Sequence, residues 1–364
     1  MKKQAGMFLV LVAVCVIAAL LSPAFLGVGN LENLTRRIGL FGIIGIGVAF
    51  VIVTGGIDLS IGSVVCLTGC GLPWLLVQLG LPPWLALPVL LGVSAVVGLW
   101  HGWLVAVVKL QPFVVTLCGL LVYRGLMRGV TQSQSQGFGS GFQDLRWWST
   151  GKLPPEAGAV GCALATLLLA WMAWRARKSG RSPLPASAAA VLAALIGGAI
   201  MQAGFQVPMP CVILIVLATL TAAFFHLTVW GRHLLALGSN EKAARFSGIA
   251  TTRLTLLAYV ACALLAGIAG MLFVMEVGSA QPSDFGNFYE LYAIAAAVIG
   301  GCSLRGGRIS VVGVVLGAAL MQVLRNVMVL AFPSQQQLEL AVIGVVILLG
   351  VLADAGMRRL PARK

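Results

Sequence analysis

The chain has 364 residues, of which only 9% are charged: 24 Lys or Arg against 10 Asp or Glu, for a net charge of +14. Sixty per cent of the residues are apolar, and the mean hydropathy is +1.02. Soluble domains carry about 25% charged residues, so this composition excludes a soluble enzyme and a disordered chain. In so apolar a chain, the excess of Lys and Arg sets the orientation of membrane spans and does not indicate a nucleic-acid partner.

Three stretches contain no charged side chain: residues 4–31, 59–108 and 182–231. A spanning helix needs about 20 apolar residues, so each of the two longer stretches holds two spans. Within a membrane only helices and closed barrels satisfy their own backbone hydrogen bonds. The alternation of apolar and polar residues that marks a barrel is absent. The sequence therefore predicts an all-α polytopic membrane protein.

Twelve apolar segments are candidate crossings, and in chain order they are 7–28, 38–55, 59–80, 84–107, 112–130, 157–174, 186–204, 208–230, 254–277, 288–301, 309–331 and 337–354. The tenth is too short to cross a bilayer and is predicted to be a half-helix or a re-entrant segment. We therefore expect about 10–12 transmembrane helices.

The positions of Lys and Arg predict the topology. With Lys2 and Lys3 inside, the basic positions that fall inside are Lys109, 175–181, 232–253, Arg305 with Arg308, and 358–364. The loops at 131–153, 278–287 and 332–336 fall outside and contain few Lys or Arg residues. Arg36 and Arg37 are exceptions, since the same count places them outside. The agreement of the other positions predicts cytoplasmic ends for the chain.

Two glycine pairs suggest an internal duplication. The segments 54–60 (TGGIDLS) and 299–305 (IGGCSLR) share the pattern Gly-Gly-x-x-Leu at an offset of 245 residues. Glycine pairs break helices and let irregular backbone line a cavity. The alternative is a chance match, because the chain contains 45 glycines. The candidates for a translocation path are Thr54, Gly55, Gly56, Asp58, Gly300 and Gly301.

The segment 231–249 is the one long hydrophilic interior stretch. Ser239 or Asn240 can cap a helix, Glu241 suits its first turn, and Gly248 can end it in a left-handed conformation. These signals predict a short helix of about two turns on the membrane surface. The alternative is an ordinary cytoplasmic loop.

Five segments of the sequence resemble motifs of a known family. The segment 237–249 (LGSNEKAARFSGI) is similar to the cytoplasmic "EAA" loop of permease subunits in bacterial ABC importers, in the version found in ribose/xylose-type monosaccharide permeases. Four further motifs match the same family in order: 55–63 (GGIDLSIGS), 112–117 (PFVVTL), 280–282 (AQP) and 293–301 (AIAAAVIGG). The resemblance covers about residues 30–354.

The resemblance implies a transmembrane subunit of an ATP-driven monosaccharide importer in the bacterial inner membrane. It implies four partners: a separate ATP-binding subunit, a second permease that is identical or different, a periplasmic sugar-binding protein and the sugar. The ATPase-coupling loop would comprise Gly238, Asn240, Glu241, Ala243, Ala244, Arg245 and Gly248. We expect Ala243 and Ala244 to face the ATPase.

The resemblance also suggests how the chain is organised. Shorter family members have ten spans, so 157–174 and 186–204 are interpreted as an inserted pair. We expect one transmembrane domain over 1–354, with core spans in 7–130 and 208–354, an inserted helix pair at about 155–205, and a basic cytoplasmic tail at 355–364.

Several single residues have two interpretations each. Asp58 can hydrogen-bond sugar hydroxyls, or it can cap the helix that begins near Leu59 and tie down the glycine break. His101 and Trp103 flank Gly102, and Gly98 and Gly102 form a small-xxx-small face that favours close helix contact over ligand binding. Glu276 and Glu290 are expected at the outer ends of spans as solvent-exposed boundary residues, and the alternative is that they dock basic groups of a binding protein.

Other function classes fit less well. An ion-coupled secondary transporter is the alternative, but apart from Asp58 the predicted span interiors hold almost no ionisable groups for coupling. No phosphate-binding loop is present, so ATP hydrolysis is expected in a partner. The chain is therefore not expected to be an enzyme. The three His and eight Cys form no ligand pattern, and we expect no catalytic residues, metal or cofactor.

Overall fold

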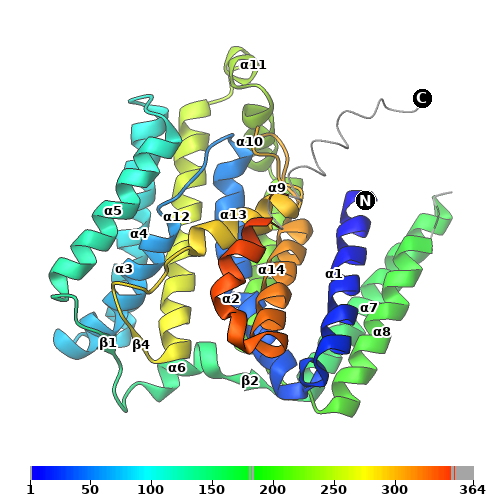
Figure 1. The fold of residues 1–364 in the computed structure, drawn as a ribbon. Coiled ribbons are helices and arrows are strands. Elements are labelled where there is room, and N and C mark those ends of the chain that lie inside the picture. The colour runs from blue at the N-terminus through cyan, green and yellow to red at the C-terminus, as the bar shows by residue number, and fades with distance from the viewer. Residues whose placement is uncertain (1, 180–181, 183, 346–347, 349–364) are drawn as a thin grey trace.

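The structure, a computed structural model, describes residues 2–179, 182, 184–345 and 348, and these form a bundle of helices (Figure 1). Within the described residues, nine helices are long and apolar enough to cross a membrane. These nine are α2 (Val28–Val53), α3 (Ile61–Pro73, continued by η2, Trp74–Gln78), α4 (Pro83–Ala106), α5 (Pro112–Val130), α7 (Pro155–Lys178), α8 (Leu184–Ala203), α9 (Met209–Leu227), α12 (Thr251–Val277) and α14 (Val311–Ala331). They are preceded by α1 (Lys2–Leu21), which is not counted among the nine. The predicted all-α polytopic class is confirmed.

Short elements connect these helices. They are η1 (Pro23–Leu26), β1 (Gln136–Gly137), α6 (Gln143–Thr150), β2 (Lys152–Leu153), β3 (Val207–Pro208), α10 (Val229–Ser239), α11 (Glu241–Phe246), β4 (Ser279–Ala280), α13 (Tyr289–Ile299) and η3 (Pro333–Leu338). The strands form two antiparallel pairs, β1 with β4 and β2 with β3. Of the predicted twelfth crossing (337–354), residues 337–345 and 348 are described, and its other residues and the basic tail at 355–364 lie outside the described part of the chain.

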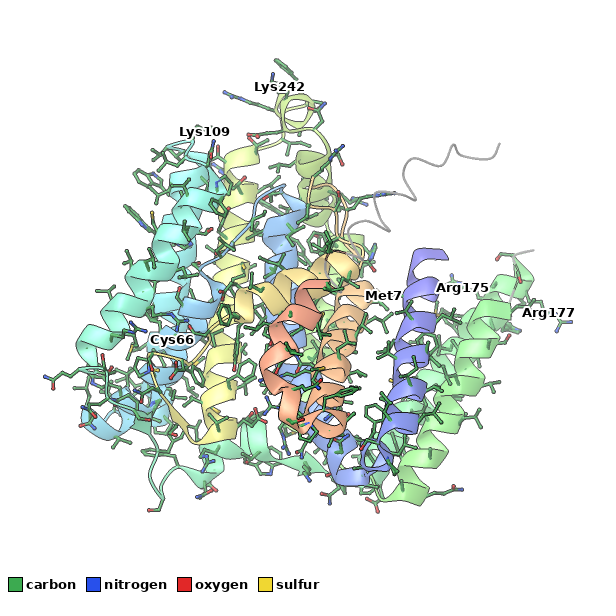
Figure 2. All side chains as sticks on the ribbon, in the orientation of Figure 1. Met7, Cys66, Lys109, Arg175, Arg177 and Lys242 are labelled. Atoms are coloured by element: carbon green, nitrogen blue, oxygen red, sulfur yellow. The ribbon has the colours of Figure 1, made fainter. Side chains whose placement is uncertain are left out.

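The two ends of the bundle differ in charge. The N-terminus, α10 and α11 lie at one end, and α6, β1, β2 and β4 lie at the other (Figure 1). Lys109, Lys242, Arg175 and Arg177 lie toward the first end (Figure 2). We call this the inner end, because Lys and Arg concentrate on the cytoplasmic side of membrane proteins.

Helices α2, α3 and α12 form the centre, and glycines let them approach their neighbours closely. A Cβ added at Gly47 of α2 would lie 3.1 Å from the Cys262 carbonyl oxygen on α12. On α4, a Cβ at Gly98 would lie 2.6 Å from Val260 Cα and one at Gly102 would lie 2.9 Å from Leu256 Cα. The predicted small-xxx-small contact is confirmed, and its partner is α12.

Two helix–break–helix units run in opposite directions through the bundle. In the first, α2 ends at the inner end, 54–60 turns back into the bundle, and α3 begins there. In the second, α12 ends at the outer end, 281–288 turns back inward, and α13 begins inside (Figure 1). The half-helix predicted for the tenth segment is therefore confirmed.

The starts of α3 and α13 meet. A Cβ at Gly62 would lie 2.4 Å from the Gly286 carbonyl oxygen and would also collide with the Glu290 carboxylate. Gly55 (φ 86°) and Gly278 (φ 84°) take the same left-handed conformation after the long helix of each unit. The structural repeat thus pairs α2–α3 with α12–α13. The sequence repeat instead pairs Gly55–Gly56, which follow α2, with Gly300–Gly301, which follow α13, so the two repeats do not coincide.

Helices α7 and α8 lie together at the edge of the bundle, beside α1 (Figure 1). Their connection to the centre is polar and lies at the outer end. Glu32 of α2 accepts hydrogen bonds from Lys152 Nζ at 2.5 Å and from the Gln206 backbone N–H at 2.8 Å. Because Lys152 and Gln206 flank the pair, this carboxylate anchors both of its ends to α2.

Candidate functional site

Helix α11 at the inner end has the start and stop that the sequence predicts. The Asn240 side chain accepts a hydrogen bond from the Ala243 backbone N–H at 3.0 Å, and Glu241 occupies the first turn. Gly248 has φ 78°, and its N–H donates to the Arg245 carbonyl at 3.0 Å. The result is a short, capped helix that projects from the inner end of the bundle (Figure 1).

The orientation of α11 corrects one expectation. Ala244 is buried against the chain itself, with 5% of its surface exposed, so it does not face outward. Phe246 is 91% exposed and Ala243 is also exposed. The register of a six-residue helix depends on its packing against α10 and α12, which its own sequence does not encode.

Glycine contacts join the coupling loop to the rest of the inner end. Gly238, at the end of α10, lies so close to the end of α2 that an added Cβ would be 1.7 Å from the Val53 carbonyl oxygen. The same oxygen accepts a hydrogen bond from Gly307 N–H at 2.9 Å. Gly306 has φ 84° and packs against the Gly238 carbonyl and the Gly55 amide. We call this contact between the ends of α10 and α2 and the loop 303–308 the glycine junction.

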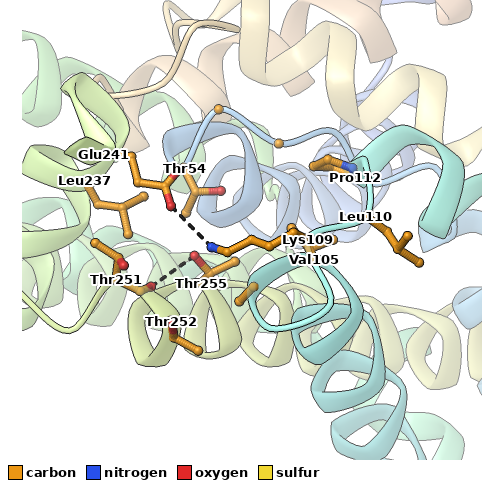
Figure 3. Close-up of a pocket in the computed structure, with 13 residues that line it drawn as sticks. Thr54, Val105, Lys109, Leu110, Pro112, Leu237, Glu241, Thr251, Thr252 and Thr255 are labelled. Atoms are coloured by element: carbon orange, nitrogen blue, oxygen red, sulfur yellow. Dashed lines mark hydrogen bonds and ion pairs between the residues drawn. The ribbon is translucent and has the colours of Figure 1, made fainter. Parts of the chain in front are cut away.

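A cavity of about 260 Å³ lies beside the junction (Figure 3). Lys109 Nζ lies 3.6 Å from Glu241 Oε1 across its mouth. Both side chains are more than half exposed, so the ion pair contributes little stability. The lining residues are Thr54, Gly55, Gly56, Val105, Ala106, Lys109, Leu110, Pro112, Leu237, Glu241, Thr251, Thr252 and Thr255. The structure thus brings three candidate path residues together with a member of the coupling loop.

Asp58 lies deeper, with 2% of its surface exposed. Its Oδ1 accepts hydrogen bonds from the Ser60 backbone N–H at 2.9 Å and from Ser60 Oγ at 2.6 Å. These bonds hold the turn that starts α3, because an aspartate side chain commonly bonds the backbone two residues onward. Of the two interpretations from sequence, this geometry is that of the structural tie.

The Asp58 turn continues into a buried polar chain. Ser60 Oγ lies 3.4 Å from His101 Nδ1, and His101 Nε2 lies 2.8 Å from the Tyr123 hydroxyl. With Ser60 Oγ donating to Asp58, the neutral His101 tautomer that satisfies both contacts donates from Nδ1 to Ser60 Oγ and accepts at Nε2 from the Tyr123 hydroxyl. Each of the three hydrogen bonds then has one proton. The polar chain therefore joins α3, α4 and α5 around the break at 54–60. The sequence pattern identified His101 only as a neighbour of packing glycines.

The second glycine pair lies apart from the cavity. A Cβ at Gly300 would lie 2.5 Å from the Gly313 backbone, so Gly300 packs α13 against α14. Gly301, with φ 95°, begins the loop that leads to the junction. The loop that follows Gly301 reaches the first glycine pair at Arg305, whose carbonyl oxygen lies 3.6 Å from an added Cβ at Gly55, and at Gly306, which packs against the Gly55 amide.

The expectation of a solvent-exposed Glu290 is wrong. This residue is 8% exposed, and its Oε2 has no hydrogen-bond partner among the described residues. It lies in the first turn of α13 and against the first turn of α3, where two positive helix ends favour a carboxylate. The sequence could not show this, because the re-entry of 281–288 moves the start of α13 inward.

No cluster of three or more His, Cys, Asp or Glu side chains that could bind a metal occurs within the described residues.

Comparisons with known proteins agree with the transporter motifs. Residues 30–351 match the family described as the branched-chain amino acid transport system / permease component. The chain is 35% identical to the xylose transport system permease protein XylH of Escherichia coli K12, over 92% of this chain and 87% of that protein. It is 34% identical to XylH of Haemophilus influenzae, over 97% and 96%. It is 32% identical to the ribose import permease protein RbsC of Bacillus subtilis, over 97% and 92%. No solved structure gives a significant match.

Proposed function

The chain belongs to the family of branched-chain amino acid transport system permease components, and from this premise we propose that it moves a monosaccharide through the membrane, driven by ATP hydrolysis in a partner. It is a multi-pass permease of the bacterial inner membrane and is not itself an enzyme. The proposal of a monosaccharide rests on the xylose and ribose permeases that it resembles over nearly its whole length.

The exposed helix α11 is the observation that carries the coupling mechanism. Phe246 is almost fully exposed at the inner end, beside exposed Lys242 and Ala243. An aromatic side chain so exposed at an aqueous end is a typical anchor for a protein partner. The ATP-binding subunit docks on this face of α11, and Ala244 holds the helix against the permease.

The glycine junction transmits the movement. When the ATPase subunits close, α11 and the end of α10 move together, because only Asn240 separates them. Gly238 contacts Val53 backbone to backbone, so its displacement reaches the α2–α3 break without an intervening flexible side chain. The break ends at Asp58, whose polar chain continues to α4 and α5. Movement at the inner end therefore opens or closes the path at Thr54–Asp58.

Three further partners complete the importer. A second permease, either a copy of this chain or a related one, forms the other wall of the path. A periplasmic sugar-binding protein delivers the substrate at the outer end, where α6 and the strand pairs lie (Figure 1). The sugar itself is the cargo.

The inserted pair α7–α8 is peripheral to transport in this proposal. In the most apolar stretches of α7 and α8, only 6% and 11% of the residues are buried. These two helices therefore contribute little to the centre of the bundle. The remaining core, with spans in 7–130 and 208–354, forms the single transmembrane domain.

Reconstitution tests the proposed function. The permease, its ATPase and its binding protein are purified together, placed in liposomes, and supplied with D-xylose or D-ribose and internal ATP. We expect uptake that requires ATP, and we expect Phe246→Ala to weaken co-purification of the ATPase by tenfold or more. Trp84→Ala, which removes an aromatic side chain 74% exposed in α4, is the matched control and should leave the complex intact.

Two results would contradict this proposal. Uptake driven by a proton or sodium gradient without the ATPase would indicate the ion-coupled alternative. Unchanged co-purification of the ATPase with Phe246→Ala would place the docking surface elsewhere.

A further inference from the structure

Two arginines occupy the outer half of α5. Arg124 and Arg128 lie one turn apart, so they share one face of the helix. Arg124 is half-buried and Arg128 is exposed. Neither forms an ion pair within the described residues. Arginine in a membrane span is costly, and it typically faces water or a polar path and marks where substrates pass. Neither residue is used by the mechanism above.

Both side chains bind the same backbone carbonyl. Arg124 Nη1 donates to the Ser283 oxygen at 3.2 Å and Arg128 Nη2 at 3.4 Å, and Asn287 Nδ2 donates to it at 2.9 Å. A carbonyl oxygen has two lone pairs, so three donors exceed what it can accept well. Each guanidinium also has four further N–H groups. Donor groups are therefore in surplus at this point, and they favour a ligand rich in oxygen atoms.

A carboxylate stands next to these donors. Asp284 is exposed, and its Oδ2 accepts a hydrogen bond from Ser283 Oγ at 2.8 Å. Its other oxygen makes no hydrogen bond to a described residue. Two arginines and one aspartate leave the site only weakly positive. An anionic ligand would meet the Asp284 charge, whereas a hydroxyl group can accept from arginine and donate to aspartate.

An aromatic residue follows in a strained conformation. Phe288 has φ 63° and is 48% exposed. A bulky residue in the left-handed region is an outlier, and such strain concentrates at ligand-binding sites. Its ring offers an apolar surface next to Asn287 in the chain, and apolar surface with a few polar groups is the usual composition of a small-molecule site.

The segment 279–288, which contains Ser283, Asp284, Asn287 and Phe288, leads inward from the outer end of the bundle. β4 pairs with β1 at the outer end, and the Pro282 carbonyl then accepts from Cys66 Sγ of α3 at 3.6 Å. Cys66 lies between the two ends of the bundle (Figure 2). The segment continues to α13, whose start meets the start of α3. The segment 279–288 therefore runs from the outer end, past the contact of the two arginines at Ser283, to the breaks.

We propose that Arg124, Arg128, Asp284 and Asn287 form an outer substrate-contact site for an uncharged polyhydroxylated solute. The inference rests on the proposed function and adds where the sugar first binds the permease. The guanidinium and amide groups donate to hydroxyl oxygens, and the Asp284 carboxylate accepts from hydroxyl protons. Phe288 covers the C–H face of the ring.

The test uses the reconstituted importer with labelled D-xylose and D-ribose. Arg124→Gln and Asn287→Ala should each lower the sugar moved per ATP hydrolysed by about fivefold or more. ATP hydrolysis stimulated by the loaded binding protein should be retained, because α11 is untouched. Arg124→Lys, which keeps the charge but lacks the planar fork, should restore part of the uptake. A solely structural role would lower uptake and stimulated hydrolysis together.

Arg146→Gln is the matched control, since Arg146 Nε also donates to a backbone carbonyl, that of Met275, at 3.0 Å. If Arg124→Gln does not assemble, Arg128→Gln replaces it, because Arg128 is exposed. Variants that transport as well as Arg146→Gln overturn the site but leave the proposed function intact. A wild-type importer that takes up neither sugar overturns the proposed function, and with it the site.

Discussion

The central helices and the inserted pair are alike in apolarity and opposite in packing. The most apolar windows of α2 and α12 have mean hydropathies of 2.0 and 2.3, against 1.7 and 1.8 for α7 and α8. Yet 83% and 67% of the residues in these stretches of α2 and α12 are buried, against 6% and 11% of those in α7 and α8. Hydropathy decides that a segment spans the membrane; it does not decide whether the segment belongs to the core.

The contacts of the glycines separate the two regions. In the centre, an added Cβ at Gly39 of α2 would lie 2.5 Å from Pro210 of α9, and one at Gly270 of α12 would meet Thr68 of α3. In the pair, Gly197 of α8 meets only α7, and its nearest neighbour is Cys162. Because lipid is as apolar as these helices, close backbone approach and polar contacts hold the centre together. The pair makes such approaches mainly within itself.

The largest effect is expected at the glycine junction. Gly238→Val would place carbon atoms within the contact distance of the Val53 oxygen, so α10 and α2 must separate. We expect ATP-driven uptake to fall at least tenfold while the chain still inserts. Ala236→Val, on the exposed side of α10, is the control. Normal uptake by Gly238→Val would show that the junction does not carry the coupling movement.

A second substitution tests the packing of α4 against α12. Gly98→Leu would force Val260 away, and overpacking of this kind costs about 1–3 kcal/mol. Gly92→Leu on the same helix meets nothing within 4 Å and should be nearly neutral. The thermal unfolding midpoints of the two purified variants measure the difference. Equal midpoints would mean that close approach does not stabilise the centre.

A smaller effect is expected in the buried polar chain. His101→Leu leaves the Tyr123 hydroxyl without its partner, at a cost of about 1–3 kcal/mol. Adding Tyr123→Phe removes the orphaned hydroxyl, so the double variant should be less destabilised than the sum of the single ones. Thermal unfolding of the three variants measures the coupling. Additive changes would argue against a continuous chain.

The smallest effect is expected from removing the inserted pair. Deletion of 155–205 leaves Leu153 and Val207, which pair in the β2–β3 register, and an Asn-Gly turn can join the two strands. Lys152 and Gln206 then still reach Glu32. We expect sugar uptake within about twofold of the full chain. Loss of uptake in a deletion that still binds the ATPase would give α7–α8 a direct role.

Local signals were enough to predict some features of the inner end. Asn240, Glu241 and Gly248 act through hydrogen bonds and backbone angles within a few residues, so their pattern predicted the bounds of α11. The direction of Ala244 could not be predicted in this way. It depends on how α11 packs in space against α10 and α12, the helices that precede and follow it in the chain.

The sequence by itself determined that this chain lies in a membrane as helices and which family it belongs to, and it predicts which end faces the cytoplasm. Composition and short motifs carry that information, because each helix satisfies its own backbone within lipid. Only the tertiary structure decided that Glu290 is buried, that His101 joins Asp58 to Tyr123, and that two arginines converge on Ser283. Those contacts join residues 22 to 159 positions apart, and they exist because two breaks fold back into the bundle.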